Sequence, residues 1–546
     1  MSDNTRFGTN ALNGNTGIQN SGFGASSIQN SSSGYYNSAI GAFTLANNTS
    51  GSSNSALGTN ALLKNTDGHY NTAIGTASMC FNTTGSKNTS IGSNCLENNT
   101  TGNDNVAIGT QSLFKNIAGN GNIAIGNNSL FNFNREDEEL HLNTAIGHNA
   151  LYTNNSGKNN VAIGSYALEK NTAESNTAIG TWALQYNTIG NENTAVGVRA
   201  LKDNTSGLQN TAVGSRALHY NTIGNENTAI GTWALEDNTS GIQNTAVGAR
   251  ALENNTSGLR NTALGRGALQ SNISGSNNTA VGREALQFNI SGTNNTAVGL
   301  DSLCNATGNL NTAVGTYALK GTDGGSTNIG YENTAVGAYA LRSNTSGLRN
   351  TAVGSNALQF NTETNDNTAV GVDSLRNATG KLNTALGAKA LEKNISGSNC
   401  TCIGYNSQSS TSETSNEITL GDYNIVVLRC AATLSTLSDE RDKKDIVSLE
   451  PNSGINFVSK LVPVNFVWNM RNGGKLGIPA QGFIAQSLQQ LQTDTNIVIP
   501  GLVYDVNPER LEASYGALIP IMVQAIKDLK NQVDILQQEI SVLKSV

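Results

Sequence analysis

The stretch Asn193-Thr-Ala-Val-Gly-Val-Arg-Ala-Leu-Lys-Asp-Asn-Thr-Ser-Gly-Leu-Gln209 is one unit of a 17-residue repeat that fills most of the chain. The pattern N-T-A-V-G-x-x-A-L-x-x-N-T-x-G-x-x occurs 24 times, the last copy starting at Cys400, and most steps are 17 residues long. Gly stands at position 5 of all 24 units. A fixed period of this length is typical of stacked structural units, so we expect a solenoid with one coil per repeat.

The residue types within the unit favour β-structure over helix. Thr-Ala-Val at positions 2 to 4 is a short strand signal, and Gly at position 5 supplies a tight corner or a positive φ. Asn side chains can stack in hydrogen-bonded ladders, whereas a Gly in every unit would cost a helix about 1 kcal/mol each. Each coil has only about four apolar positions (Ala, Val, Ala and Leu), so coils must stack, and several chains side by side are favoured. We predict a mainly β fold, a long trimeric β-solenoid or β-roll over residues 1–410.

Two steps of the repeat are longer than the others, Asn122 to Asn143 and Asn311 to Asn333. They contain Arg135-Glu-Asp-Glu-Glu139 and Gly321-Thr-Asp-Gly-Gly325. These segments are charged or rich in turn residues, so we expect loops that leave the stack without interrupting it.

Composition limits the classes of function. The 546 residues carry a net charge of −7 with only 13% charged residues, so no basic face predicts a nucleic-acid partner. The longest apolar runs are too short to span a membrane, and the N-terminus lacks the apolar stretch of a secretory signal. We therefore expect synthesis in the cytoplasm and a place on a virion surface or in a fibre.

Cysteine usage predicts neither a metal site nor a cofactor. The six cysteines lack metal-ligand spacing, and Cys95 and Cys402 occupy positions that hold Ala in other repeats. We interpret them as small packing residues without disulfides.

Position 7 of the repeat varies and is expected to face solvent. In mid-chain it holds aromatic and arginine residues, namely Tyr166, Trp182, Arg199, Arg216, Trp233 and Arg250. Aromatic rings among guanidinium groups can bind a glycan or an anionic protein surface, so a host-surface glycan or protein receptor is one hypothesis. The alternative is that large side chains merely shield the outer face of the roll. The Thr column at position 2 suggests ice binding only remotely, because Thr is expected to point inward or to a partner chain.

A composition shift marks the second part of the chain. All six prolines lie after residue 450, and a β connector over residues 411–437 precedes a compact α+β segment over residues 438–546. Residues 518–546 are predicted to form a coiled coil, because apolar residues alternate there at steps of three and four. The seam comprises Ile519, Met522, Ile526, Leu529, Val533, Leu536, Ile540 and Leu543. The alternative is one amphipathic helix packed on its own domain.

Both parts resemble known families. Asn37-Ser-Ala-Ile-Gly41 and Asn54-Ser-Ala-Leu-Gly58 are similar to the head repeats of trimeric autotransporter adhesins, which form parallel β-rolls. The C-terminal part carries Ser438-Asp-Glu-Arg-Asp-Lys-Lys-Asp-Ile446, then Gly482-Phe-Ile-Ala-Gln486, then a helix after Tyr515 with Ala525-Ile-Lys-Asp-Leu529. In this order the three motifs resemble the intramolecular chaperone of endosialidase, found at the end of phage tailspikes and fibres.

This resemblance implies that the C-terminal domain trimerises, directs folding of the fibre and then releases itself. The implied scissile bond joins Leu437 and Ser438, with Ser438 as nucleophile, Lys443 as general base and Asp439 and Arg441 in support. The chain would then be a single-turnover self-cleaving serine peptidase. No histidine follows His219, so a Ser-His-Asp triad cannot be built in this segment.

Residue spacing adds one condition to that implied site. Residues five apart do not share a helix face, so Ser438 and Lys443 must meet through a turn or across chains. Taken alone, the charged segment that contains them would be a solvated cluster.

The repeats give a physical reason for such a domain. Near-identical coils on three chains could align one repeat out of step at little cost, and a trimerising domain would fix the register. The sequence therefore predicts a trimeric, tailspike-like fibre that attaches to a surface. An uncleaved structural or adhesive fibre is the alternative. A glycan-degrading tailspike is the weakest hypothesis, because the repeats show no recurrent carboxylate pair.

Overall fold

A computed structural model describes residues 3–135, 139–321, 328–425, 427–429, 431, 438–471 and 475–545 of the chain. The chain forms two compact units, residues 1–350 and 351–546. Coils of the repeat occur in both units, and the second unit also contains the C-terminal domain.

Each repeat contributes one strand of three residues, which occupies positions 2 to 4. The coil strands of the first unit are β1 (Thr5–Phe7), β2 (Ser21–Phe23), β3 (Ser38–Ile40), β4 (Ser55–Leu57), β5 (Thr72–Ile74), β6 (Thr89–Ile91), β7 (Val106–Ile108), β8 (Ile123–Ile125), β9 (Thr144–Ile146), β10 (Val161–Ile163), β11 (Thr177–Ile179), β12 (Thr194–Val196), β13 (Thr211–Val213), β14 (Thr228–Ile230), β15 (Thr245–Val247), β16 (Thr262–Leu264), β17 (Thr279–Val281), β18 (Thr296–Val298), β19 (Thr312–Val314) and β20 (Thr334–Val336). Those of the second unit are β21 (Thr351–Val353), β22 (Thr368–Val370), β23 (Thr384–Leu386), β24 (Thr401–Ile403) and β25 (Ile418–Leu420).

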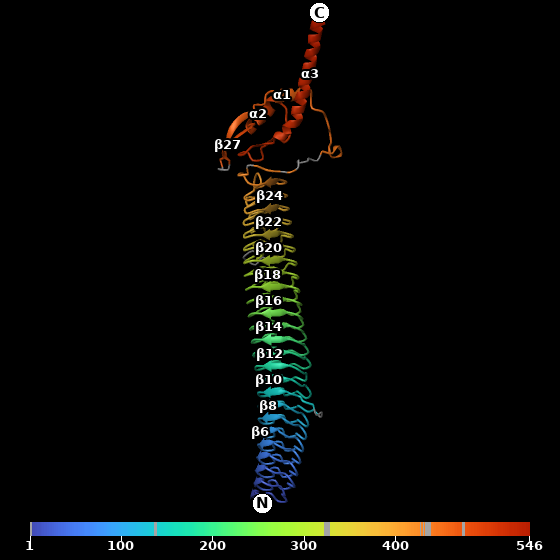
Figure 1. Cartoon of the computed structure of the whole chain (residues 1–546), viewed down its shortest axis with the longest axis vertical. Coiled ribbons are helices and arrows are strands. Elements are labelled where there is room, and N and C mark those ends of the chain that lie inside the picture. The colour runs from blue at the N-terminus through green and yellow to red at the C-terminus, as the bar shows by residue number, and fades with distance from the viewer. Residues whose placement is uncertain are drawn as a thin grey trace. The chain divides into compact units, whose positions relative to one another are not determined.

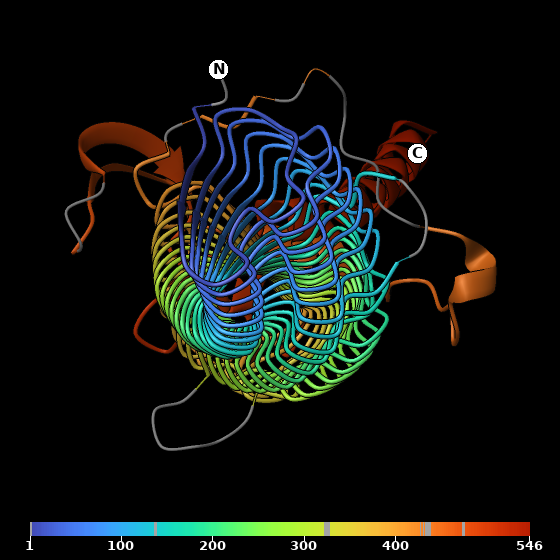
Figure 2. The same ribbon diagram turned by 90° about the horizontal axis from the view of Figure 1, so that it is seen from below.

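Successive strands pair in parallel and in register, so equivalent positions of neighbouring coils lie side by side. In β12 and β13, for example, Thr194 faces Thr211 and Val196 faces Val213. Figure 1 shows the strands of successive coils stacked, and Figure 2 looks along the stack. The 24-turn β-solenoid predicted from the repeat is confirmed. Strand β25 continues the stack for one strand beyond the last recognised repeat, because Glu417-Ile-Thr-Leu-Gly421 keeps the spacing of the motif.

The core of a coil is made by positions 3, 8 and 9. In one coil these are Ala195, Ala200 and Leu201, all with no exposed surface. Val at position 4, the fourth apolar position of the coil, lies outside this core, because Val213 is 37% exposed. Side chains alternate between the two faces of a strand, so positions 2 and 4 share the outer face when position 3 points inward. Thr194 at position 2 accordingly lies partly exposed rather than inside its own coil.

The Gly at position 5 is required by both backbone conformation and space. Gly214 has φ +135°, which L side chains rarely adopt, and a Cβ there would lie 2.5 Å from the carbonyl oxygen of Gly231 in the next coil. Neighbouring coils therefore approach each other backbone to backbone at this corner. The expected positive φ is confirmed.

Three further positions of the coil adopt the left-handed conformation with ordinary residues. Arg199 at position 7, Leu201 at position 9 and Gln209 at position 17 have φ values of 60°, 50° and 56°. A left-handed conformation costs a residue other than Gly roughly 1–2 kcal/mol. Such a conformation persists only where the surrounding structure fixes it, and here the neighbouring coils do so.

The backbone N–H groups of these three residues donate to carbonyls of neighbouring coils, and two buried Asn ladders also connect the coils. Asn210 at position 1 donates from its backbone N–H to Oδ1 of Asn193 (3.0 Å) and from Nδ2 to the carbonyl of Gly224 (2.8 Å). Asn204 at position 12 donates from Nδ2 to Oδ1 of Asn187 (2.7 Å). All of these side chains are fully buried, so each amide satisfies groups that would otherwise lack partners. The expected Asn ladders are confirmed.

The C-terminal domain has a different architecture. Its elements are the short 3₁₀ turn η1 (Glu440–Asp442), α1 (Ser453–Val458), β26 (Val464–Asn469), β27 (Leu476–Gly482), α2 (Ala485–Thr495), β28 (Val503–Tyr504), β29 (Glu512–Ala513), the 3₁₀ turn η2 (Tyr515–Ala517) and α3 (Leu518–Ser545). Strands β26 and β27 form an antiparallel pair, as do β28 and β29. The small core consists of Phe457, Leu488, Leu502, Leu518 and Ile521. The predicted α+β class is confirmed.

The cysteines behave as packing residues. Cys80, Cys95, Cys304, Cys400 and Cys402 are buried free thiols, and Cys430 lies outside the described residues. Burial raises the pKa of Cys304 to about 12 and that of Cys402 to about 11, so neither is a reactive thiolate.

Helices of the described part of the chain include none that is long and apolar enough to cross a membrane.

Candidate functional site

The site predicted at the start of the C-terminal domain is shaped by a single tight turn. Asp439 caps η1 by accepting the backbone N–H of Arg441 (2.9 Å). At the other end of the turn, the backbone N–H of Lys443 donates to the carbonyl of Glu440 (3.1 Å). The turn shortens the path between Asp439 and Lys443, so side chains on either side of it can meet.

Ser438 and Lys443 do meet across this turn. Nζ of Lys443 lies 2.7 Å from Oγ of Ser438 and 3.3 Å from the Ser438 carbonyl oxygen. The spacing of five residues, which a helix would not bring together, is bridged here by η1 within one chain. A nucleophile and a base need this hydrogen-bond distance for proton transfer.

Asp439 and Arg441 stabilise the turn and bond to each other. Nη2 of Arg441 lies 2.5 Å from Oδ2 of Asp439. Hydrogen bonds from the side chain and backbone of Arg441 hold the pKa of Asp439 below its usual range, so the cap remains charged. The structure thus places both predicted supporting residues in the turn that positions Ser438 and Lys443.

This site is open in the single chain. Every residue from 438 to 450 is exposed to solvent. Leu437, the other side of the predicted scissile bond, lies outside the described residues.

The second and third sequence motifs contact each other. The hydroxyl of Tyr515 donates to the carbonyl of Phe483 (3.0 Å) and accepts its backbone N–H (3.0 Å). A Cβ at Gly482 would lie 2.6 Å from the Tyr515 hydroxyl, so a larger residue would displace the ring. The Gly-Phe pair and Tyr515 therefore form one unit that joins β27 to the start of α3.

Asp528 is a structural residue that sequence reasoning missed. It is buried in α3 and accepts the backbone N–H groups of Asn452 (3.0 Å) and Ile455 (3.1 Å) at the start of α1. Burial alone would raise the pKa of Asp528, but hydrogen bonds from Gln524 and the α1 backbone outweigh it and lower the pKa. Its only signal in the sequence is its position three residues after Ala525, where an acidic residue falls on an otherwise apolar face of the helix.

Helix α3 has two apolar faces. One face holds Leu518, Ile521 and Ala525, which pack on the domain core. The other face is the predicted seam, and all eight of its residues are 41–74% exposed. The alternative of a helix packed on its own domain therefore accounts for the first face only.

The predicted binding residues at position 7 contact other side chains of the coils. The guanidinium of Arg199 lies 5.0 Å from the ring centre of Trp182, and that of Arg250 lies 4.9 Å from Trp233. Arg216 pairs with Glu236 (3.4 Å), and Tyr166 lies edge-on to His148 (5.3 Å). These contacts favour the shielding role, because the groups that would bind a ligand already have partners.

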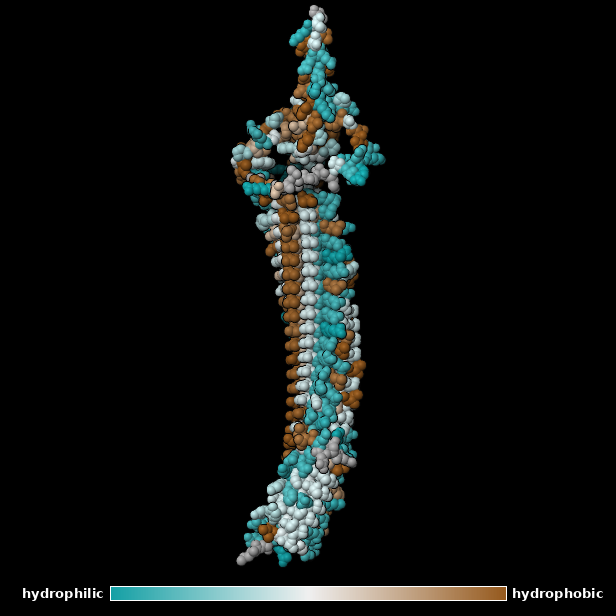
Figure 3. All heavy atoms as spheres, turned by 45° about the vertical axis from the view of Figure 1, so that its right-hand side comes forward, coloured by the Kyte–Doolittle hydropathy of each residue, from teal (hydrophilic) through white to brown (hydrophobic). Residues whose placement is uncertain are grey.

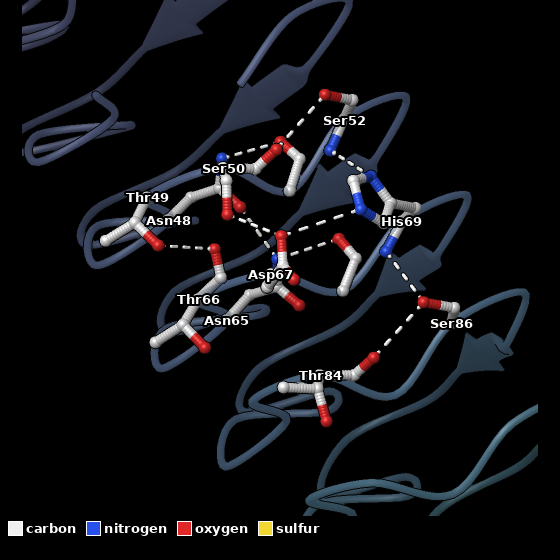
Figure 4. A network of polar contacts seen from close by, with 12 residues as sticks. Asn48, Thr49, Ser50, Ser52, Asn65, Thr66, Asp67, His69, Thr84 and Ser86 are labelled. Carbon is white, nitrogen blue, oxygen red and sulfur yellow. Dashed lines mark hydrogen bonds and ion pairs between the residues drawn. The ribbon is translucent and has the colours of Figure 1, made fainter. Parts of the chain in front are cut away.

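Ser, Asp and His also gather on the coils, but not as a catalytic triad. Oγ of Ser50 donates to Asp67, and Nε2 of His69 lies 3.6 Å from the same carboxylate (Figure 4). Nδ1 of His69 accepts the backbone N–H of Ser52 (3.0 Å). The side chains of Ser50 and His69 therefore meet the carboxylate instead of each other, and Ser50 is not activated by His69.

Comparison with known proteins gives one match. Neither a curated protein nor a solved structure matches the chain. A family model described as chaperone of endosialidase, which is classed among the peptidases, matches residues 438–497. The matched segment begins at Ser438 and includes the turn, α1, β26, β27 and α2. Residues 438–497 of this β-solenoid protein are thus similar to the chaperone of endosialidase.

Proposed function

We propose that this chain is the subunit of a trimeric, tailspike-like fibre whose C-terminal domain assembles the trimer and then cuts itself off between Leu437 and Ser438. The observation that carries the proposal is the family match starting at Ser438, on the residue whose Oγ accepts a hydrogen bond from Lys443. The exposed seam of α3 supports assembly, because eight apolar side chains in coiled-coil spacing have no cover in one chain.

The cleavage chemistry needs only these two side chains and water. Neutral Lys443 takes the proton from Oγ of Ser438, and Oγ attacks the carbonyl carbon of Leu437. The amide bond to the Ser438 nitrogen breaks as that nitrogen takes the proton from Lys443, leaving an ester between Leu437 and Oγ. Water then hydrolyses the ester to a Leu437 carboxylate, restores the Ser438 hydroxyl and leaves Ser438 with a free amino group.

Exposure of the site in one chain makes the reaction depend on assembly. A lysine acts as a base only when neutral, and burial favours the neutral form. Since residues 438–450 are exposed in the single chain, further copies have to supply the cover. Cleavage would then follow trimerisation and leave a fibre that cannot easily revert to free chains.

Denaturing electrophoresis and intact-mass measurement of the expressed full chain test the proposal. We expect two fragments, residues 1–437 and 438–546, from the unmodified chain. Ser438→Ala and Lys443→Gln should each leave the chain intact, whereas Lys444→Gln should cleave normally, because Lys444 stands beside the pair without belonging to it. Fragments that persist in Ser438→Ala would contradict the proposed nucleophile.

The second candidate is a fibre that keeps its C-terminal domain. The exposure of residues 438–450 in one chain favours it, because nothing in the single chain shields the pair from water. Light scattering separates the two: a trimer of full-length chains with no fragment would support the uncleaved fibre.

A further inference from the structure

The outer face of the coil strands carries an apolar column that the proposed assembly does not yet explain. The position-4 column is the third residue of each strand from β1 to β25, and all 25 are Val, Ile, Leu or Phe. These side chains are partly exposed, for example Leu57 by 46% and Leu386 by 47%. Figure 3 shows an apolar stripe running over successive coils.

Exposed positions elsewhere in the coil do not show this uniformity. Position 7 holds Trp182, Arg199, Glu284, Asp301 and Lys389 in different coils. A solvent-facing position has no physical reason to stay apolar in every coil, because a polar side chain is equally compatible there. Something apolar must therefore cover the position-4 column in the mature protein.

The form of the column indicates what covers it. An occupant has to present apolar groups at the spacing of stacked strands, about 4.8 Å, along the successive coils of a unit. No charged residue stands at position 2 or 4 of strands β1–β25, so the face offers nothing to a charged partner. The 20 column residues of the first unit, from β1 to β20, match the roughly 20–30 residues a side of a stable protein interface. A second copy of the same solenoid meets all of these requirements.

We propose that copies of this chain pack in parallel with their position-4 columns facing one another in register. The inference rests on the proposed fibre assembly and assigns its interface along the coils. The column is one residue wide and lies beside the corner at Gly of position 5. A narrow ridge is buried most completely where several copies converge on a common axis. Position 2 then flanks the interface, which accounts for the neutral Thr found there in most coils.

Crosslinking of single cysteines in the full chain tests this interface. Val196 belongs to the column, whereas Val198, 46% exposed, lies two residues away in the same coil and serves as the matched control. Both Cys variants are made with Cys430→Ser, since the described native thiols are buried. We expect mild oxidation to link Val196→Cys chains through the same residue, because a disulfide requires Cβ atoms about 3.8 Å apart, and to leave Val198→Cys chains unlinked.

Charge in the column gives a second measurement. Val196→Glu with Val370→Glu should lower the assembled fraction at least tenfold in light scattering, whereas Val198→Glu with Val372→Glu should not. An assembled protein that links equally well at both positions, or at neither, would overturn the assigned face while leaving fibre assembly intact. An unmodified chain that remains a monomer would overturn the proposed function as well.

Discussion

The coils and the C-terminal domain are stabilised by contacts of opposite kinds, repeated in the coils and unique in the domain. In the coils, hydrogen bonds of the Asn ladders recur in many successive repeats, and each coil depends only on its neighbours. In the C-terminal domain, contacts such as Tyr515 with Phe483 occur once and join segments far apart in sequence. Repeated coils make a long structure, but neighbouring chains could pair in several registers. The contacts of the C-terminal domain occur once, so they fix a single register but do not lengthen the molecule. A fibre of this kind needs both.

The largest expected effect is in the domain, at the closest approach of its helices. A Cβ at Gly454 in α1 would lie 2.1 Å from the backbone nitrogen of Ala525 in α3, so Gly454→Ala forces the helices apart. We expect a loss of about 3–5 kcal/mol that unfolds the domain as a whole. Hydrogen exchange over α1 and α3 measures it. Gly516→Ala is the control, since its Cβ would meet only the Ser514 hydroxyl at 4.0 Å. Equal protection in the two variants would contradict this packing.

A comparable substitution in the coils should destabilise only the neighbouring coils. Asn227 accepts the backbone N–H of Asn244 (3.0 Å) and donates to the carbonyl of Gly241 (2.8 Å), so Asn227→Ala leaves two buried groups unpaired. We expect about 2–3 kcal/mol of local destabilisation. Hydrogen exchange should rise in the coils next to residue 227 and stay unchanged far along the stack. Asn254→Ala, at an exposed position, is the control, and a loss of protection through the whole solenoid would contradict nearest-neighbour behaviour.

Mild acid should separate the two regions. The pKa of His219 is lowered to about 4, mainly by burial; Asp203 opposes the shift, and Lys202, Arg216 and Arg199 add to it. An unfolded histidine titrates near pH 6.5, so stability falls as pH drops from about 6.5 towards 4, by about 2 kcal/mol at pH 5. The pKa of Asp528 is lowered, so this carboxylate stays charged until the pH falls below the ordinary pKa of an aspartate, about 4. Its hydrogen bonds to the start of α1 are weakened only below that pH.

The variant His219→Gln sharpens this test, because Gln occupies the same repeat position at residue 185. At pH 5 the variant should keep the local hydrogen-exchange protection that the unmodified coils lose. The same loss in both chains would assign the acid response to other groups.

The smallest effect is expected on the outer face of the coils. Replacing Trp182 and Trp233 with Ala removes the rings that Arg199 and Arg250 cover, each worth roughly 0.5–1 kcal/mol. We expect slightly faster exchange in these coils and unchanged attachment to cell surfaces, measured by a binding assay. Lost attachment with intact coils would instead support the receptor hypothesis at position 7.

Sequence reasoning predicted much of this molecule because its local rules are repeated. One Gly in every unit predicted the positive φ and the corner, and the regular Asn predicted the ladders. The prolines after residue 450 marked where the coils give way to a compact domain. The left-handed conformations of Arg199, Leu201 and Gln209 could not be predicted, because residues of these types adopt them only when neighbouring coils impose them.

The sequence by itself determined the residue types and their order. From these followed the division into coils and a C-terminal domain, and the candidate pair Ser438 and Lys443. Only the tertiary structure decided which faces are covered. It placed Ala195 inside the coil and Val196 outside, brought Lys443 to Ser438 through η1, and buried Asp528 against α1. A period in the sequence specifies that residues share a face, but which face is buried depends on what packs against it.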